Sequence, residues 1–465
     1  MRESIGPIHV ALEGRGDLAT SIYRQLLDAI VDGRLRAGEK LPPSRELAQR
    51  LEVARNTVSV AYERLIAEGF LTARVGSGTF VGAVGSSGKR RAPSGRDVQP
   101  RQLWRTLRAT PPVGSSVYDF RVGVPDWKLF PLETWRRLVS SELRPSIIRD
   151  SHYRDPAGHP RLREAIARYI GISRSVRADA SDVVVTQGAQ QALDLIARVL
   201  IEPGDHVAVE DPGYPPARQL FAINGAHVDA VPVDSEGIVV DAIPRSVKLV
   251  YVTPSHQFPL GIAMSAARRA TLLDWAQRRG AVIIEDDYDS EFRFADRPLE
   301  PLQSLDRSGR VIYVGSFSKT MLPMLRIGFL VAPASLQPAL HIAKQLADWR
   351  GDLSTQGALA RFLDEGMLAR HIRKASRVYA ARHELITTIL RRDFADVLEV
   401  VPSAAGLHLC ARLRPAAGYV PVPWVETLDR YCFQTVQDGL VLGYGGIPLE
   451  QITPALRRLA RAFTR

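Results

Sequence analysis

The chain has 465 residues, an apolar content of 45% and a formal net charge of +11, which fits a globular protein with more than one domain. The N-terminus lacks an apolar run of signal-peptide length, and no apolar stretch of about 20 residues could span a bilayer. We therefore expect a cytoplasmic protein without a membrane partner. Cys410 and Cys432 are the two cysteines, which excludes a disulfide framework or a cysteine-rich metal site, and we expect no metal.

The first predicted elements form a small helical domain. Apolar residues recur at helical spacing from Ile22 to Ile30, and a second helix follows the Pro-Pro pair with Ser44 as its expected N-cap. The stretch "ARNTVSVAYERLIAEGF" predicts a third helix after a short turn, and "FLTARVGSGTFVG" alternates like a two-stranded wing. Two short helices with a tight turn fit a helix-turn-helix, whose second helix enters the major groove by its N-terminal residues.

Polar side chains at the start of the third helix suit DNA recognition. Arg55 can pair with guanine or hold a phosphate, and Asn56 and Thr57 can reach base edges or phosphates. A small three-helix domain with exposed arginines that bind nothing is the alternative. The segment "LPPSRELAQRLEVARNTVSVAYERLIAEGFLTARVGSGTFV" resembles the winged helix of GntR regulators, over essentially all of residues 18–82. This resemblance implies a double-stranded DNA operator as partner and a DNA surface formed by Arg45, Arg55, Asn56, Thr57 and Gly76.

Residues 83–115 read as a linker. They are rich in Gly, Ser, Pro and Arg, and they carry seven basic residues but only one acidic residue, Asp97. The basic groups could touch phosphates or merely keep the segment soluble. We therefore expect a DNA-binding domain at residues 15–82, a flexible basic linker at 83–115 and a large domain at 116–465.

The large domain alternates short apolar runs with helical stretches. "DVVVTQGAQQALDLIARVL" reads as strand, turn and helix, whereas "AVIIEDDYDSEF" and "RVIYVGSFSKT" are strands that stop at polar residues. This pattern predicts an α/β fold with a mostly parallel central sheet, flanking helices and functional groups at the carboxyl ends of the strands.

Several of these strand ends carry groups that pyridoxal 5'-phosphate requires. The cofactor needs a lysine of lowered pKa for a Schiff base, a carboxylate against its ring nitrogen and donors for its phosphate. Lys319 is the candidate lysine, Asp286 the candidate carboxylate, and Tyr288 can reach the ring hydroxyl. Each feature alone also fits a solvated lysine or an acidic turn, but their shared position at strand ends favours the cofactor.

The phosphate and the ring have further candidates. Backbone N–H groups at a helix start form a natural phosphate seat, hydroxyls and a guanidinium can complete it, and a tyrosine can stack on the ring. The candidates for the backbone seat are Gly188, Ala189 and Gln190. Ser316, Ser318 and Arg326 are the candidates for the hydroxyls and the guanidinium, and Tyr214 is the candidate for stacking on the ring.

Residues from about 118 to 465 resemble a fold-type I aminotransferase with a smaller C-terminal α+β lobe. The motifs "YRDPAGHPRLREAIARYI", "EDPGY", "TPSHQFPLG", "IIEDDYDSEFR" and "SFSKTMLPMLRIGF" are similar to those of the MocR subfamily of GntR regulators. The resemblance implies Lys319 as the Schiff-base lysine and the residues above as its cofactor contacts. It also implies a homodimer, with head-to-tail exchange of the DNA-binding domains, in which a tyrosine matched by Tyr153 reaches the phosphate across the interface.

The chain departs from aminotransferases at two positions. Phe258 replaces the asparagine that touches the ring hydroxyl, a contact that is lost or left to His256 or Gln257. In "LVLGYGG", Val441 stands where an arginine would hold a substrate carboxylate, and Pro216 replaces an arginine found after "PGY" in some related regulators. Without these arginines, a small-molecule effector either lacks an α-carboxylate or is held by other groups such as Arg121, Arg350 or His408. Alternatively, the effector is the cofactor itself.

These features favour a transcriptional regulator that senses pyridoxal phosphate or an amine-like effector, with no net catalysis. A working transaminase with an attached DNA-binding module is the alternative, and the missing arginine counts against it. A scaffold used only for dimerisation is less favoured, because a scaffold needs neither the lysine nor the phosphate residues.

Overall fold

The computed structural model describes residues 2–5, 8–11, 17–82, 98–107, 117–148, 155–294, 300–403, 405–415 and 417–464. Contacts divide the chain into two compact units, Met1–Trp104 and Arg105–Arg465. The boundary falls inside the predicted linker, whose short helix α4 (Gln102–Thr106) is described, although most of the linker lies outside the described residues. No described helix is long and apolar enough to cross a membrane.

The smaller unit is a winged helix-turn-helix. Its elements are α1 (Leu18–Val31), β3 (Lys40–Leu41), α2 (Ser44–Arg50), α3 (Arg55–Ala67), β4 (Leu71–Arg74) and β5 (Gly78–Val81), preceded by the paired strands β1 (Arg2–Ile5) and β2 (Ile8–Ala11). The three wing strands form an antiparallel sheet in the order β3-β5-β4. Ile22, Leu26, Val58 and Leu65 lie in one core because they recur at helical spacing. The predicted N-cap was off by one residue, since Pro43 takes that place and Ser44 opens the helix.

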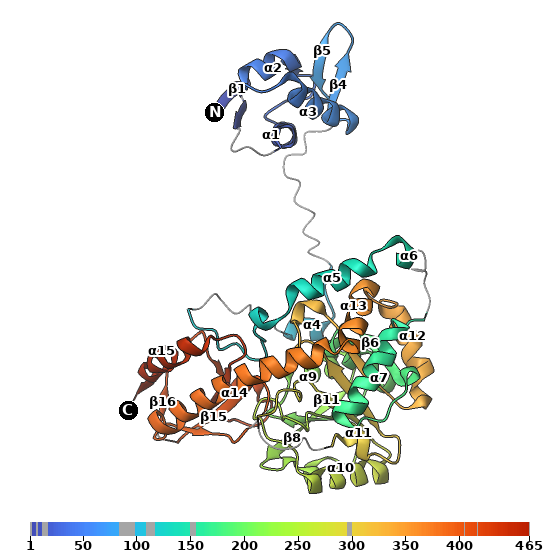
Figure 1. Ribbon diagram of the computed structural model, residues 1–465, viewed down its shortest axis with the longest axis vertical. Helices are drawn as coiled ribbons and strands as arrows, with labels where there is room; N and C mark the ends of the chain where they lie inside the picture. Colours follow the sequence, from blue (N-terminus) through green and yellow to red (C-terminus); the bar gives the residue numbers. More distant parts are fainter. Residues whose placement is uncertain are drawn as a thin grey trace. The chain divides into compact units, whose positions relative to one another are not determined.

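The larger unit is built on an eight-stranded sheet in the order β6-β13-β12-β11-β10-β7-β8-β9 (Figure 1). Its strands are β6 (Val183–Thr186), β7 (His206–Asp211), β8 (His227–Asp234), β9 (Gly237–Ile238), β10 (Val247–Val252), β11 (Val282–Asp287), β12 (Val311–Ser316) and β13 (Gly328–Val331). The run from β12 to β8 is parallel, whereas β13 and β9 pair antiparallel with their neighbours. The predicted α/β class with a mostly parallel sheet is confirmed.

The sheet is buried on both faces, which explains its continuous apolar strands. In β6, Val183 and Val185 enter one core cluster with Leu162 of α7 (Pro160–Arg174), whereas Val184 enters the cluster on the other side with Leu193 of α8 (Ala189–Leu200). The helices that precede the smaller lobe in this unit are α5 (Leu132–Glu142), α6 (Pro145–Ile148), α7 (Pro160–Arg174), α8 (Ala189–Leu200), α9 (Pro215–Ile223), α10 (Ala266–Arg279), α11 (Leu302–Leu305), α12 (Gln337–Ala347) and α13 (Leu353–Asp364).

A smaller lobe completes the chain. It contains α14 (Met367–Asp393), α15 (Leu449–Leu459) and an antiparallel sheet of β14 (Leu398–Val400), β15 (His408–Leu413), β18 (Gly439–Gly443) and β17 (Glu426–Thr427), with β16 (Gly418–Tyr419) and β19 (Phe463–Thr464) paired beside it. This is the C-terminal α+β lobe that the sequence predicts. Because parallel strands end at a common edge, the polar ends of β7, β11 and β12 meet near this lobe.

Candidate functional site

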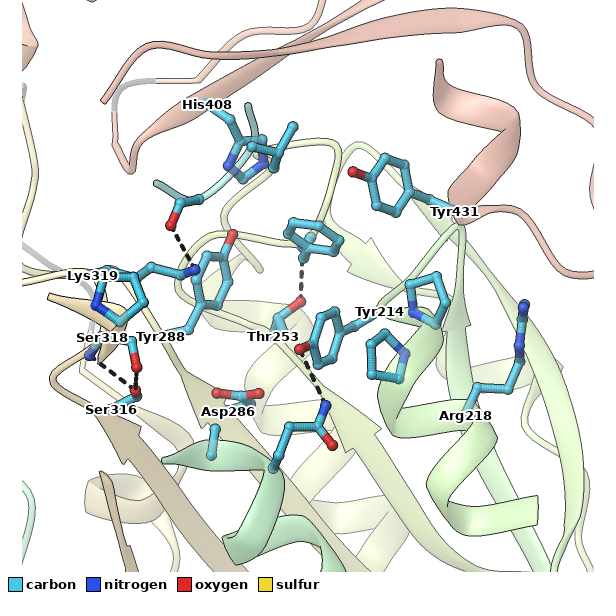
Figure 2. A pocket seen from close by; sticks show the side chains of 18 of the residues that line it. Tyr214, Arg218, Thr253, Asp286, Tyr288, Ser316, Ser318, Lys319, His408 and Tyr431 are labelled. Atoms are coloured by element: carbon cyan, nitrogen blue, oxygen red, sulfur yellow. Dashed lines mark hydrogen bonds between the residues drawn. The ribbon is translucent and has the colours of Figure 1, made fainter. Parts of the chain in front are cut away.

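A cavity of about 820 Å³ lies at the carboxyl ends of these strands. Nine predicted cofactor residues line it: Ala189, Gln190, Tyr214, Asp286, Tyr288, Ser316, Ser318, Lys319 and Arg326. Gly188 directly precedes the first of them, and Tyr153 lies outside the described residues. Residues from the ends of β7, β11 and β12, from just before β13 and from the N-terminus of α8 thus share one space (Figure 2).

Lys319 follows β12 and reaches into the cavity. Its Nζ donates a hydrogen bond to the carbonyl oxygen of Gly123 at 2.8 Å. Burial lowers the pKa of Lys319, although the charges of Asp289 and Asp286 oppose this shift. A lowered pKa increases the neutral fraction of the amine, which is the form that attacks an aldehyde.

Asp286 is the penultimate residue of β11 and lies at the floor of the cavity (Figure 2). Burial raises the pKa of its carboxyl to about 7, whereas a 2.8 Å hydrogen bond donated by the Tyr251 hydroxyl to Oδ2 lowers it. The other oxygen, Oδ1, is buried and has no hydrogen-bond partner among the described residues. An orphaned carboxylate oxygen is costly, and a ring N–H of pyridoxal phosphate would satisfy it. The residues present therefore fit this cofactor.

The residues predicted to bind the phosphate lie together in one corner of the site. Gly188 is the N-cap of α8, with φ +77, and a Cβ on it would lie 3.0 Å from Nη2 of Arg326. That Nη2 donates to the carbonyl of Gln187 at 2.8 Å. Ser316 accepts from the Ser318 N–H at 3.1 Å, and the two hydroxyls are 3.0 Å apart. A helix N-terminus, two hydroxyls and a guanidinium make an anion seat.

Tyr214 lies over the middle of the cavity floor (Figure 2). Its hydroxyl accepts from Gln190 Nε2 at 3.2 Å, and its ring makes an edge contact with Phe258, with centroids 5.6 Å apart. This arrangement holds the ring in place beside the cavity, where a flat aromatic ligand can pack against it.

The two neighbours of Phe258, Gln257 and His256, form hydrogen bonds within the protein. Gln257 is buried, and its amide nitrogen donates to the carbonyls of Pro212 and Phe258 at 2.9 and 2.7 Å. His256 is also buried, and its Nδ1 lies 3.1 Å from Asp289 and 3.0 Å from the Tyr288 hydroxyl. Neither residue is among those that line the cavity. Both stabilise the strand-end loops, because buried polar groups must be paired.

The residues that the sequence analysis considered for binding an effector carboxylate differ in whether they line the cavity. Val441 is fully buried opposite Cys410 in β15 and does not line the cavity. Arg121 donates hydrogen bonds of 2.7 and 2.5 Å to the carboxylate of Asp119. Neither Arg121 nor Arg350 lines the cavity. His408 does line it.

Two arginines that the sequence did not single out line the cavity. Arg218, two residues after Pro216, stacks on Phe433 at 4.3 Å and donates to the Cys432 carbonyl at 3.4 Å. Arg430 lies 3.8 Å from Glu426. Figure 2 shows Arg218 across the cavity from Lys319. The helical spacing of "PGYPPAR" could have revealed Arg218, since it lies one turn into α9, close to Tyr214.

The predicted DNA-binding residues lie on the surface of the smaller unit. Arg55, Asn56 and Thr57 are the first three residues of α3, and the two former are exposed. Arg45 is exposed in the first turn of α2, and Gly76 lies in the β4–β5 turn with φ +74.

Comparisons with known proteins agree with this architecture. Residues 18–81 match the family of bacterial regulatory proteins called gntR, and residues 129–435 match aminotransferase class I and II. The chain is 39% identical to a probable rhizopine catabolism regulatory protein, MocR, of Rhizobium meliloti, over 95% of this chain and 93% of that protein. It is 32% identical to the pyridoxine biosynthesis transcriptional regulator PdxR of Corynebacterium glutamicum, over 84% of this chain and 82% of that one.

Solved structures resemble the larger unit. A kynurenine aminotransferase of Pyrococcus horikoshii aligns with a TM-score of 0.73 and 26% identity, over 79% of this chain and 98% of that one. A multiple substrate aminotransferase of Thermococcus profundus aligns with a TM-score of 0.70 and 28% identity, over 78% of this chain and 96% of that one.

Proposed function

The chain belongs to the MocR subfamily of GntR-type transcriptional regulators, and on this premise we propose that its larger unit binds pyridoxal phosphate on Lys319 and reports a small-molecule signal to DNA. The observation that carries the proposal is the convergence of Lys319, Asp286 and Arg326 on one cavity. In this proposal residues 15–82 bind the operator, residues 116–465 bind cofactor and effector, and residues 83–115 connect them.

Pyridoxal phosphate, when bound, supplies an aldehyde that captures amines. The chain's residues divide the work of holding it. Lys319 would offer its amine to the aldehyde, and Asp286 would hold the protonated ring nitrogen through Oδ1. The phosphate would be held by Ser316, Ser318, Arg326 and the N-terminus of α8, and Tyr214 would pack against the ring.

Arg218 indicates which effectors fit the remaining space. Among the described residues it forms no ion pair, and burial lowers its pKa, so its charge is only partly compensated. It lies opposite Lys319 (Figure 2). An amine whose anionic group lies at the far end from the amino group would place one end at each residue, because a guanidinium binds carboxylate or sulfonate through two parallel hydrogen bonds. Pyridoxal phosphate itself as the signal remains the second outcome of the test below.

The link to DNA follows from symmetry. A homodimer of the larger unit would carry two winged helices, and an effector that favours one of two arrangements would change their spacing on paired half-sites. Tyr153 of the partner subunit would complete the phosphate seat in such a dimer.

Absorbance and DNA binding, measured on the same samples, test the proposal. Pyridoxal phosphate should give the wild-type protein a visible band that Lys319→Ala loses, whereas Lys248→Ala, which removes an exposed lysine paired with Asp205, should keep it. ω-Amino acids, aminosulfonates and uncharged amines are then titrated, with anisotropy on a DNA fragment selected from a random pool. An amine that changes both band and anisotropy identifies the effector class.

The results separate the alternatives. Absence of a band would exclude the cofactor role. A band that forms while only free pyridoxal phosphate alters DNA binding identifies the cofactor as the signal. Repeated conversion of an amino acid and a keto acid into their transamination products would instead support the alternative function, a working transaminase.

A further inference from the structure

The side chain of Asp286 accepts a hydrogen bond from a tyrosine inside the central sheet, and the proposed function gives this tyrosine no role. Tyr251 in β10 pairs with Ile284 of β11, two residues before Asp286, so the two side chains leave adjacent strands on the same face. Its hydroxyl donates to Asp286 Oδ2 at 2.8 Å. Tyr251 is only 1% exposed, and its ring packs edge-on against Phe221 with centroids 5.9 Å apart. The hydroxyl is therefore fixed on one carboxylate oxygen.

We propose that Tyr251 is a positioning residue for the cofactor: it occupies Oδ2 of Asp286, holds that carboxyl group in place and leaves Oδ1 as the acceptor for the cofactor's ring N–H. The proposal rests on the proposed function, since it presupposes that pyridoxal phosphate binds in this cavity. Tyr251 lines the cavity itself, but its hydroxyl is committed to Asp286.

The charge on Asp286 is finely balanced, which gives the hydrogen bond its importance. The pKa of this carboxyl is raised to about 7, chiefly by burial and also by the charges of Asp287 and Asp289, although the Tyr251 hydroxyl and Lys319 act to lower it. Without the hydroxyl, more of Asp286 is protonated at neutral pH. A protonated carboxyl no longer stabilises a protonated ring nitrogen, and the electron-withdrawing property of the cofactor depends on that proton.

The chain offers a matched control in Tyr313. This tyrosine is buried in β12, and its hydroxyl donates to Oδ2 of Asp287 at 2.6 Å, but it does not line the cavity. Tyr251→Phe and Tyr313→Phe thus remove the same group from equally buried aspartate partners, one in the cofactor site and one behind it.

The test is made on the full chain with pyridoxal phosphate. We expect Tyr251→Phe to raise the dissociation constant roughly ten-fold at pH 7, because loss of this hydrogen bond leaves more of Asp286 protonated and a protonated carboxyl binds the ring N–H less well. With cofactor labelled by ¹⁵N in the ring, its resonance should move toward the value of neutral pyridine. Tyr313→Phe should leave both quantities at wild-type values, and thermal unfolding of the cofactor-free proteins reports on folding.

A double-mutant cycle keeps the proposal open to refutation if folding is affected. On an Asp286→Asn background, Tyr251→Phe should have no further effect on affinity, because the carboxylate it supports is gone. Wild-type affinity and an unchanged resonance in Tyr251→Phe, or an equal loss in Tyr313→Phe, would overturn the role of Tyr251. If the wild-type protein binds no pyridoxal phosphate, it is the proposed function that fails.

Discussion

Lys319 Nζ donates a hydrogen bond to the carbonyl oxygen of Gly123 at 2.8 Å, although the two residues are 196 positions apart. Gly123 has φ +70, and a Cβ added to it would lie 2.6 Å from that nitrogen. The free lysine is therefore held against a stretch of backbone that has room for it only because residue 123 has no side chain.

This contact predicts that Gly123→Ala impairs cofactor capture more than folding. The added methyl group displaces the flexible end of Lys319 rather than the backbone around it, and we expect roughly ten-fold weaker binding of pyridoxal phosphate, measured by absorbance titration. The positive φ should cost about 1 kcal/mol of stability.

Gly309→Ala is the control for that strain. Gly309 has φ +66 in the same unit, but nothing lies within 4 Å of its added Cβ. It should show a similar loss of stability with unchanged cofactor binding. Equal loss of binding in both variants would contradict the role given to the Gly123 contact.

Arg326 should act on the phosphate and on no other part of the cofactor. Arg326→Gln removes the fork beside Gly188, so the affinity for pyridoxal phosphate should fall by about ten-fold or more. Pyridoxal, which has no phosphate, should bind the variant and the wild type alike. The two dissociation constants, measured side by side, check this; a loss of affinity for pyridoxal of the same size would argue against a phosphate contact.

Stability should depend on pH through Glu210. The pKa of this carboxyl is raised to about 7, chiefly by burial and also by the charge of Asp286. Hydrogen bonds from Thr253 and Gln257 act in the opposite direction and lower the pKa. Since the folded protein holds the proton more tightly than the unfolded chain, the stabilisation is complete below pH about 4.5 and is lost as the pH rises through about 7.

Glu210→Gln removes this titration while its amide oxygen can still accept hydrogen bonds. Relative to wild type, the cofactor-free variant should gain up to roughly 3 kcal/mol of unfolding free energy between pH 4.5 and pH 8. Urea unfolding at several pH values measures it. Other carboxyls with raised pKa, such as Glu285 and Glu291, titrate in both proteins and cancel in the difference.

Arg55 should contribute to DNA binding through its position at the start of α3. If it holds a phosphate, Arg55→Ala lowers affinity evenly across sequences and reduces the slope of log affinity against log salt by about 1. If it reads a guanine, the sequence preference relaxes at that position. Arg34→Ala, which removes an exposed arginine paired with Asp32 beyond α1, should change neither. Wild-type affinity and slope in Arg55→Ala would place the DNA surface elsewhere.

Much of this protein could be read from local sequence patterns. Apolar spacing gave the winged helix, and apolar runs that stop at polar residues predicted the parallel sheet with its functional edge. Lys319, Asp286 and Arg326 could be chosen because each chemical role needs a particular residue type at the end of an element. Such patterns are local, and they determine which face of a helix or strand is buried.

The tertiary structure decided which further side chains join the predicted ones at the cavity. The resemblance to aminotransferases and related regulators directed attention to Val441 and Pro216, but packing turned Val441 into the core and brought Arg218 and Arg430 to the wall. Likewise, Tyr251 meets Asp286 only because β10 and β11 are neighbours in the sheet, 35 positions apart in the chain. Strand order and the placing of the C-terminal lobe depend on contacts between distant residues, and the spacing of residues within one segment carries no information about them.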